Sequence, residues 1–405
     1  MKKIAVIGGG AAGMMAAARA IANGCSVTLY ERNDRLGRKL AITGKGRCNV
    51  TNNCDRDEFF KNVPTNPRFL YSSYSNFSSQ DTMEFFENLG VPLKTERGNR
   101  VFPVSDRAFD IVDALANLVK KNVVHARVSG IETENGEIIG VKVGGNTVPY
   151  DAVIVCTGGV SYQKTGSDGD GIRFAKSLGL ETVPCRPSLV PIESPDRICP
   201  DMQGLSLKNV AIKAENEDGK TVYEDFGEMM FTHFGVTGPM ILSLSSMIPD
   251  LGEKKYTLYI DMKPALDEKE LDNRLLSDFS KNLNRDFINS LSALLPSRMI
   301  PVFVKMSGIA PDRKVNSITK EERKSLVTLL KRFPVHLSGF RPINEAIITK
   351  GGVSVKEINP KTLESKKIRG LYFAGEVIDV DAYTGGFNLQ IAFSTAVTAA
   401  DSASW

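Results

Sequence analysis

The chain has 405 residues, of which 42% are hydrophobic and 24% charged, and its 51 Lys and Arg against 47 Asp and Glu leave a formal net charge of +4. Its 35 Gly and 19 Pro are close to average usage, which excludes collagen-like, low-complexity and disordered classes. The basic residues are not clustered as in a nucleic-acid interface, and no apolar run approaches the roughly 18 residues of a membrane span. We therefore expect two or three domains at roughly 150 residues each, with neither nucleic acid nor membrane as a partner.

The six cysteines lie far apart without a CxxC pair, and only three histidines accompany them. This spacing argues against a structural zinc site and against a disulfide framework. We therefore expect no bound metal and, as the compartment, a reducing cytoplasm. Glycines interrupt the apolar stretch that follows Met1 too early for a secretory signal.

The beginning of the chain predicts a dinucleotide-binding unit. Its elements in order are a strand at 3–7, a glycine-rich turn, an Ala-rich helix at 14–23 and a strand at 26–30. In the turn, Gly8 permits the tight bend, Gly10 lets the backbone approach a pyrophosphate, and Gly13 lets the helix pack on the strand. Glu31 lies 18 residues beyond Gly13, at the end of the second strand, where its carboxylate can accept hydrogen bonds from ribose hydroxyls.

The middle of the chain changes character twice. Helical segments are expected first, and short strands then form a β-meander with an Asn135-Gly136 turn, which points to a flavin domain by fold analogy. An inserted region with its own hairpin, strand and amphipathic helices follows, before a strand and a closing helix restore the nucleotide-fold pattern. The expected ranges are helices at 81–89 and 106–121; strands at 126–134, 137–143, 147–150 and 152–155; hairpin strands at 210–214 and 221–226; a strand at 256–262; helices at 267–295 and 319–333; and a strand at 371–374 with a helix at 388–403.

Two further segments favour FAD over NAD as the resident dinucleotide. The apolar strand ending at Val155 leads into Cys156-Thr157-Gly158-Gly159, a turn of small residues that can pass close beneath a dinucleotide. The strand near the C-terminus ends in Gly375-Glu376, whose carboxylate can bond the ribityl chain. Each segment alone is ambiguous, but the three glycine motifs in this order are specific for a flavin domain.

Four long motifs carry a resemblance to a known family. They are Gly37-Arg38-Lys39-Leu40-x-x-Thr43-Gly44-x-Gly46-Arg47-Cys48-Asn49-x-Thr51-Asn52, Gly227–Pro239, Thr349-Lys350-Gly351-Gly352-Val353 and Gly375–Gln390. With them the chain resembles the two-dinucleotide-binding superfamily of the glutathione-reductase-like fold. More narrowly, it resembles the BaiN-like (YhiN or aminoacetone-oxidase-like) NAD(P)/FAD-dependent oxidoreductases, whose members have been linked to bile-acid metabolism and amine oxidation.

The resemblance covers essentially the whole chain and implies an α/β architecture in three parts. A Rossmann-like, glutathione-reductase-type FAD-binding domain with a β-meander spans 1–190 and 336–405. It is interrupted by a β-barrel-like domain at 191–265 and a helical domain at 266–335, and the resemblance implies an active site in the cleft between them.

The predicted cofactor-binding residues come from these motifs and from the start of the meander. The loop 43–52 is rich in hydrogen-bond donors and is predicted to run along the isoalloxazine and diphosphate; the alternative is a surface loop without a ligand. The start of the closing helix is predicted to face the flavin N1–C2=O edge; the alternative is a helix start without a ligand. The predicted set is Gly8, Gly10, Ala11, Ala12, Gly13, Glu31, Arg32, Arg38, Lys39, Thr43, Gly44, Gly46, Arg47, Cys48, Asn49, Val128, Thr157, Gly158, Gly159, Gly375, Glu376, Gly385, Gly386, Phe387, Asn388, Leu389 and Gln390.

The catalytic acid or base is not identified by the sequence. His233 is the one histidine inside a family motif, although a histidine between aromatic residues is more often a packed core residue. Tyr383, Asp379, Lys350 and Arg47 are the other candidates, and their spacing does not rank them.

Two cysteines and one glycine-rich segment raise the questions of a redox dithiol and of a second dinucleotide site, and the residue spacing argues against both. Cys48 and Cys54 are spaced C-x5-C around a turn, so ordinary thiols are favoured over a redox dithiol. The segment 166–171 has the wrong glycine spacing for a second dinucleotide site, so NAD(P)H is expected, if it is the donor, to bind transiently across the flavin.

These patterns predict an FAD-dependent oxidoreductase that transfers a hydride between flavin N5 and a small organic substrate, with NAD(P)H as the expected co-substrate. A carbonyl-activated C=C bond and a small amine are both open as substrates. The alternatives are an oxygen-dependent amine oxidase and, in another class, a non-catalytic flavin sensor or nucleic-acid-modifying accessory protein. The sequence does not indicate the oligomeric state.

Overall fold

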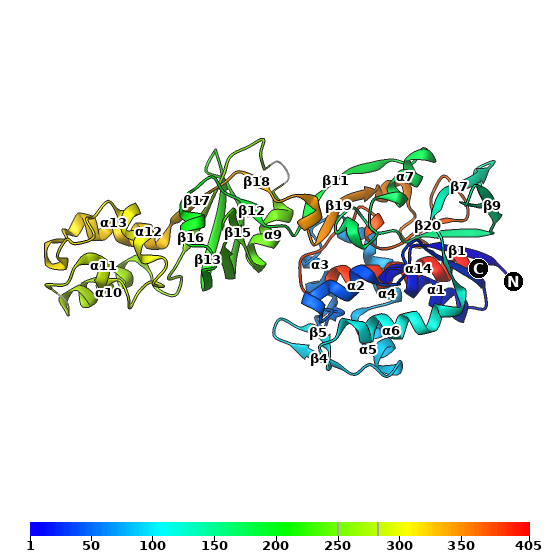
Figure 1. Ribbon diagram of the computed structural model, residues 1–405, viewed down its shortest axis with the longest axis horizontal. Helices are drawn as coiled ribbons and strands as arrows, with labels where there is room; N and C mark the ends of the chain where they lie inside the picture. The colour runs from blue at the N-terminus through cyan, green and yellow to red at the C-terminus, as the bar shows by residue number, and fades with distance from the viewer. Residues whose placement is uncertain (249–250, 282) are drawn as a thin grey trace. The chain divides into compact units, whose positions relative to one another are not determined.

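The computed structural model describes residues 1–248, 251–281 and 283–405, which divide into two compact units (Figure 1). Unit 1 comprises Met1–Ser188 and Ile343–Trp405, and unit 2 comprises Leu189–Pro342. Each unit has its own apolar core. The first unit is therefore assembled from two distant parts of the sequence.

Unit 1 is built on a five-stranded parallel sheet. The strands are β1 (Lys3–Ile7), β2 (Ser26–Glu31), β6 (Val123–His125), β10 (Ala152–Val155) and β20 (Leu371–Phe373), in the order β20-β10-β1-β2-β6. The central strands β1 and β10 are almost continuous apolar runs, which is typical of a parallel sheet that helices cover. The helices α1 (Ala11–Ala22) and α14 (Phe387–Ser404) pack against each other beside this sheet (Figure 1).

The strand order fixes where the predicted motifs meet. The chain leaves β1 for β2 and β6 on one side and later returns to β10 and β20 on the other, so the order reverses at β1. Because all five strands are parallel, their carboxyl ends lie on one edge, and ligands of open α/β sheets bind at such a reversal. The glycine turn follows β1, Glu31 is the last residue of β2, and the two later glycine motifs follow β10 and β20.

Smaller sheets and helices complete unit 1. The meander β7-β8-β9 has the predicted Asn135-Gly136 turn, in which both residues have positive φ (52° and 78°), and this hairpin is confirmed. The other elements are α2 (Arg38–Ile42), β3 (Thr51–Asn52), α3 (Arg56–Lys61), α4 (Tyr71–Asn76), α5 (Ser79–Asn88), β4 (Leu93–Glu96), β5 (Arg100–Pro103), α6 (Ala108–Val119), β7 (Val128–Glu134), β8 (Glu137–Val143), β9 (Asn146–Pro149), α7 (Asp170–Ser177), β11 (Thr182–Ser188) and β19 (Ile348–Val353).

Unit 2 contains a seven-stranded sheet in the order β17-β16-β13-β14-β15-β12-β18. Its edge strands β17 (Phe333–Leu337) and β18 (Gly339–Phe340) are separated by Ser338 alone, so the sheet curls until its two edges meet, as in a barrel. The remaining elements are β12 (Ile192–Glu193), α8 (Ile198–Asp201), β13 (Ser206–Asn216), β14 (Thr221–Phe231), β15 (Gly235–Thr237), α9 (Pro239–Met247), β16 (Tyr256–Asp261), α10 (Glu268–Ser280), α11 (Phe287–Ser290), α12 (Ile300–Ser307) and α13 (Lys320–Lys331).

The structure differs from the sequence expectation at two places in unit 2. The helix expected at 267–295 is divided into α10 and α11, because residues around Asp286 pair with residues around Lys314; Asn282 of this stretch lies outside the described residues. The unit also extends to Pro342 rather than to 335, because β17 pairs with β16 in its sheet. The division of the insert into separate β-rich and helical domains stays a prediction.

Among the helices of the described residues, none combines the length and the apolar character needed to span a membrane.

Candidate functional site

The glycine turn after β1 closes tightly on its own strand and leaves one position open. Gly8 has a φ of 104°, and a Cβ on Gly13 would overlap the Gly8 carbonyl oxygen. A Cβ on Gly10, by contrast, would meet no atom within 4 Å. Since α1 begins at Ala11 with no acidic residue in its first turn, its unpaired N–H groups face this open space and can bind an anion.

Glu31 closes the turn from the side of β2. Its Oε2 accepts a hydrogen bond from the Gly9 backbone N–H at 2.8 Å, and its Oε1 accepts from the backbone and side chain of Asn33 at 2.7 and 2.6 Å. Oε1 therefore uses both of its lone pairs, whereas Oε2 keeps one lone pair that can accept a hydrogen bond from a ribose hydroxyl. Arg38 in turn donates to the Asn33 side chain at 2.9 Å, which fixes that amide.

Glu376 joins three of the predicted motifs. Its Oε2 accepts from Lys39 Nζ at 2.7 Å, and its Oε1 accepts from the Thr349 backbone N–H at 2.8 Å and from the Ser161 hydroxyl at 3.1 Å. The side chains of Lys39 and Glu376 are each 22% exposed, so this ion pair is mostly buried. Glu376 therefore holds the sheet edge together, which is a role that the sequence did not reveal.

The Thr349 side chain fits against the motif after β10. Its hydroxyl accepts from the backbone N–H groups of Val160 and Ser161 at 2.7 and 3.0 Å. A Cβ on Gly159 would collide with this side chain, which explains why the small-residue turn is needed there. Similarly, a Cβ added to Gly375 would lie only 2.8 Å from the Cβ of Ala12. The Gly375-Glu376 segment therefore packs directly against the start of α1.

The loop 43–52 has a rigid, partly buried form. Arg47 pairs with Glu96 and Asp106 and stacks over Phe102 at 4.2 Å, so these partners hold its guanidinium. Cys48 is wholly buried. The Asn49 side-chain oxygen is buried without a hydrogen-bond partner in the described chain, which leaves it available to a bound group.

The start of α14 packs on β3 through Gly386. Its φ is 99° and a Cβ there would overlap the Thr51 carbonyl, so this position favours glycine. Gln390 is wholly buried, and its amide bonds the Thr51 hydroxyl at 2.6 Å and the Phe77 carbonyl at 3.1 Å. Gln390 therefore positions the loop through protein contacts. The Asn388 side chain accepts from the Ala382 backbone N–H at 2.9 Å and donates to the Ala382 carbonyl at 2.7 Å, which fixes the segment before the helix.

The other predicted cofactor residues lie around the same edge or within the core beside it. Arg32 is engaged by Asp168 at 2.5 Å and by the Gly166 carbonyl at 2.7 Å, and the Thr157 hydroxyl accepts from the Gly171 N–H at 3.1 Å. Val128 is buried at the start of β7. All the predicted cofactor residues are in unit 1, and their contact with a cofactor stays a prediction.

The candidate catalytic residues separate into different settings. His233 lies in unit 2, exposed and edge-on to Phe234 at 5.0 Å. Arg47 belongs to the ion pairs described above. Lys350 and Asp379 lie together in unit 1 with Asp381, whose importance the sequence missed although it is part of the Gly375–Gln390 motif.

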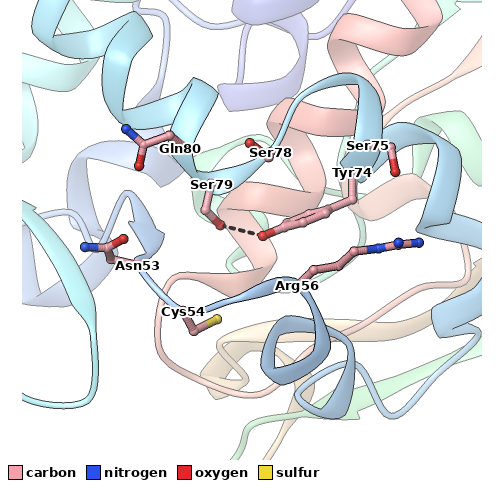
Figure 2. Close-up of a pocket in the computed structure, with 8 residues that line it drawn as sticks. All are labelled: Asn53, Cys54, Arg56, Tyr74, Ser75, Ser78, Ser79 and Gln80. Carbon is pink, nitrogen blue, oxygen red and sulfur yellow. Dashed lines mark hydrogen bonds between the residues drawn. The ribbon is translucent and has the colours of Figure 1, made fainter.

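A cavity of about 420 Å³ opens beside β3 and α5 (Figure 2). Figure 2 shows Cys54, Arg56 and Tyr74 around it, with the Tyr74 hydroxyl bonded to Ser79 at 3.3 Å. Tyr74 packs on Phe59 at 4.2 Å, which contacts Phe387 of α14 at 5.7 Å. The remaining lining residues are polar: Asn53, Ser75, Ser78, Gln80.

The cysteines of this region are free thiols. Burial raises the pKa of Cys48 to about 12 and that of half-buried Cys54 to about 11. Both are therefore protonated at neutral pH and poor nucleophiles, as the sequence favoured. We expect Cys48→Ser to retain flavin and turnover; loss of turnover with the flavin in place would revive a redox dithiol.

We further expect Cys54 to be alkylated slowly at neutral pH. With a pKa of about 11, its thiolate fraction is on the order of one in a thousand at pH 8 and rises roughly tenfold per pH unit until the pKa is reached. Iodoacetamide labelling followed by peptide mass spectrometry from pH 7 to 10 measures this slope, with buried Cys48 as an unlabelled control. A labelling rate that levels off near pH 8 would show an activated thiol instead.

The comparison with protein-family models decides the family. The model described as HI0933-like protein Rossmann domain matches residues 2–402. The chain belongs to the HI0933-like family. The resemblance to the BaiN-like oxidoreductases is thereby confirmed, and as a member of this family the chain is an FAD-dependent oxidoreductase.

Individual relatives of the HI0933-like chain span nearly all of it. It is 28% identical over 98% of its length, and 97% of the relative's, to a 3-dehydro-bile acid delta(4,6)-reductase of Clostridium scindens. It is 30% identical over 96% of its length, and 95% of the relative's, to a ribosomal RNA dihydrouridine synthase of Escherichia coli. Among solved structures, 3-ketosteroid-delta4-(5alpha)-dehydrogenase of Rhodococcus jostii matches with a TM-score of 0.51 and 15% identity, covering 100% of this chain and 97% of that one, which shows the shared fold.

The residues at the sheet edge fit the FAD that this family implies. The open space at Gly10, the unpaired amide N–H groups of α1 and the unpartnered Asn49 oxygen offer a cradle and polar partners for a phosphate-linked ligand. The residues that sequence reasoning missed are Ser161, Thr349 and Asp381. Thr349 and Asp381 belong to noted motifs, so their motif membership was the available signal.

Proposed function

We propose that this enzyme reduces a C=C bond conjugated to a carbonyl group, with NAD(P)H as the hydride source. When bound, FAD supplies hydride transfer at N5. The observation that carries the proposal is the type of reaction named for two relatives. The bile-acid reductase and the dihydrouridine synthase have different substrates, but each name describes the addition of hydrogen to a double bond. Conjugation to a carbonyl group is what makes such a double bond a hydride acceptor.

The protein's share of this reaction is binding and orientation. The Gly8–Gly13 turn and the N-terminus of α1 would hold the pyrophosphate, and Glu31 the adenosine ribose. The start of α14 at Gly386 would face the flavin edge on which negative charge develops, where helix N–H groups stabilise it. The Lys39–Glu376 pair keeps these elements in register.

The substrate class has a small-molecule and an RNA candidate. We propose first a small unsaturated carbonyl compound, in keeping with the even overall charge. One local feature of unit 2 favours RNA as the second candidate, against the even charge of the chain as a whole: residues 281–332 contain eleven Lys and Arg but four Asp and Glu, and five of these cations are ion-paired. Such a basic stretch suits a phosphate backbone.

The test is a pair of half-reactions followed by flavin absorbance. Anaerobic NADH or NADPH is expected to bleach the oxidised holoenzyme. The bleached enzyme is then mixed, without oxygen, with a 4-en-3-one steroid or with uridine-containing ribosomal RNA, and products are identified by mass spectrometry. Reoxidation with a product two mass units heavier supports the proposal. Reoxidation by oxygen alone, with an amine as the reductant, would support the amine oxidase instead.

A further inference from the structure

A buried cluster of charged groups lies where β19 meets the segment before α14. Lys350 Nζ is 3.9 Å from Asp381 Oδ1, and the Asp381 side chain is 1% exposed while that of Lys350 is 16% exposed. The Ser188 hydroxyl donates to Asp381 Oδ2 at 3.3 Å. All three residues belong to unit 1.

Asp381 Oδ1 has no hydrogen-bond partner in the part of the chain that the structure describes. The 3.9 Å separation from Lys350 is too long for a hydrogen bond, so the ion pair is not closed. A buried carboxylate oxygen without a donor is energetically unfavourable, and such exceptions are found at functional groups.

Asp379 and Arg186 also interact electrostatically with Lys350. Arg186 lies directly opposite Lys350 in the β11–β19 pairing. Asp379 accepts from the Asn66 amide at 3.2 Å, and burial raises its pKa. Burial also lowers the pKa of Lys350, which Asp381 and Asp379 oppose and Arg186 reinforces. The cluster thus holds an amine whose charge its neighbours control.

The cluster is adjacent in sequence to residues that contact the segments assigned to the flavin. Thr349, the residue before Lys350, bonds Val160, Ser161 and Glu376. Ala382, the residue after Asp381, is fixed by Asn388 in the first turn of α14. Lys350 and Asp381 are therefore each one residue from a contact that also positions the predicted flavin loops.

We infer that Lys350, positioned by Asp381, is the proton donor for the reduced substrate. This inference rests on the proposed function. The hydride and its two electrons, which originate from NAD(P)H, reach the β-carbon of the unsaturated carbonyl, and the C=C π pair moves to the α-carbon. That carbon takes a proton from Lys350 Nζ, so an N–H bond breaks and a C–H bond forms. The neutral amine regains its proton from water, and Asp381 Oδ1 stabilises the ammonium again.

The kinetic test separates the two half-reactions in Lys350→Met holoenzyme. Reduction by NAD(P)H and reoxidation by oxygen are expected within about twofold of wild type, whereas reoxidation by the unsaturated substrate slows by about 100-fold or more, the usual contribution of a general acid. Lys350→Arg, which keeps the charge but not a titrating amine, is expected to be equally slow. Lys356→Met, an exposed lysine of the same unit, is the matched control and stays at wild-type rates.

A second measurement needs no turnover. Lysines are reductively methylated with ¹³C-formaldehyde, and the signal absent from Lys350→Arg is titrated by NMR. We expect the pKa of Lys350 to lie below the ordinary value of a lysine because of burial, and to fall further in Asp381→Asn because the carboxylate favours the ammonium. The substrate half-reaction of wild type should lose rate as pH rises through that value, since the protonated amine is required.

The outcomes are distinguishable. If wild type is not reoxidised by either substrate, the proposed function fails and this inference with it. If wild type is reoxidised but Lys350→Met reacts equally fast, the proposed function stands and Lys350 is not the donor. Titration of Lys350 like an exposed lysine, unaffected by Asp381→Asn, would likewise overturn the positioning role of Asp381.

Discussion

Gly10→Val is expected to yield a folded, colourless protein. A Cβ at this position meets no atom within 4 Å, so the added side chain occupies open space and not the core. That space lies at the N-terminus of α1, where the pyrophosphate is proposed to bind, so we expect FAD affinity to fall by more than roughly tenfold, or about 1.4 kcal/mol. Because Gly10 is also the N-cap of α1, the free energy of unfolding of the apoprotein falls by only about 1 kcal/mol.

The measurement is the ratio of flavin absorbance to protein absorbance after reconstitution, with urea unfolding of the apoprotein beside it. Gly130→Val is the matched control, because it adds the same side chain to strand β7 of the same unit at ordinary contact distance from Lys142. This control should bind FAD normally. Gly13→Val should instead fail to fold, since its side chain would overlap Gly8. Full flavin occupancy in Gly10→Val would refute the assigned phosphate site.

The parts of the fold that local sequence determines were predictable. The Gly8–Gly13 turn between an apolar strand and an Ala-rich helix, and the Asn135-Gly136 hairpin, each depend on backbone conformations that few residues adopt. Hydrophobic periodicity likewise gave α5, α6 and α13 to within a few residues. The family match then confirms the Rossmann-like class.

The parts that depend on distant pairing were not predictable. The segment Phe333–Leu337 alternates apolar residues, but Pro334 weakens the strand signal, and its place in unit 2 follows from pairing with β16, which lies some 75 residues earlier. Glu376 was expected to face the ribityl chain, but its three protein partners are 27, 215 and 337 residues away in sequence. The Lys350–Asp381 cluster is similarly non-local: the spacing of these residues gave no reason to rank one above another.

Glu376→Ala is expected to lower the free energy of unfolding by about 3 kcal/mol. The substitution leaves Lys39, mostly buried, without its counter-ion and removes the acceptor of the Thr349 N–H and the Ser161 hydroxyl. Hydrogen bonds to charged groups contribute about 1.5–3 kcal/mol each, and solvent that enters the site offsets part of the loss. We expect FAD affinity to fall as well, because the three predicted motifs lose their common partner. Urea unfolding of apoprotein and reconstituted holoprotein measures both effects.

Two further variants decide whether Glu376 acts on the cofactor through the protein scaffold. Glu376→Gln keeps an acceptor for Thr349 but not the charge for Lys39, so it should fall between wild type and Glu376→Ala. In the double variant Lys39→Met with Glu376→Ala, the loss should be smaller than the sum of the two single losses, since no uncompensated charge remains. Glu137→Ala, which breaks an exposed pair with Arg369, is the control and should change stability by no more than about 0.5 kcal/mol. If the apoprotein of Glu376→Ala is as stable as wild type while FAD binding is lost, Glu376 contacts the ribityl chain directly and the scaffold role is wrong.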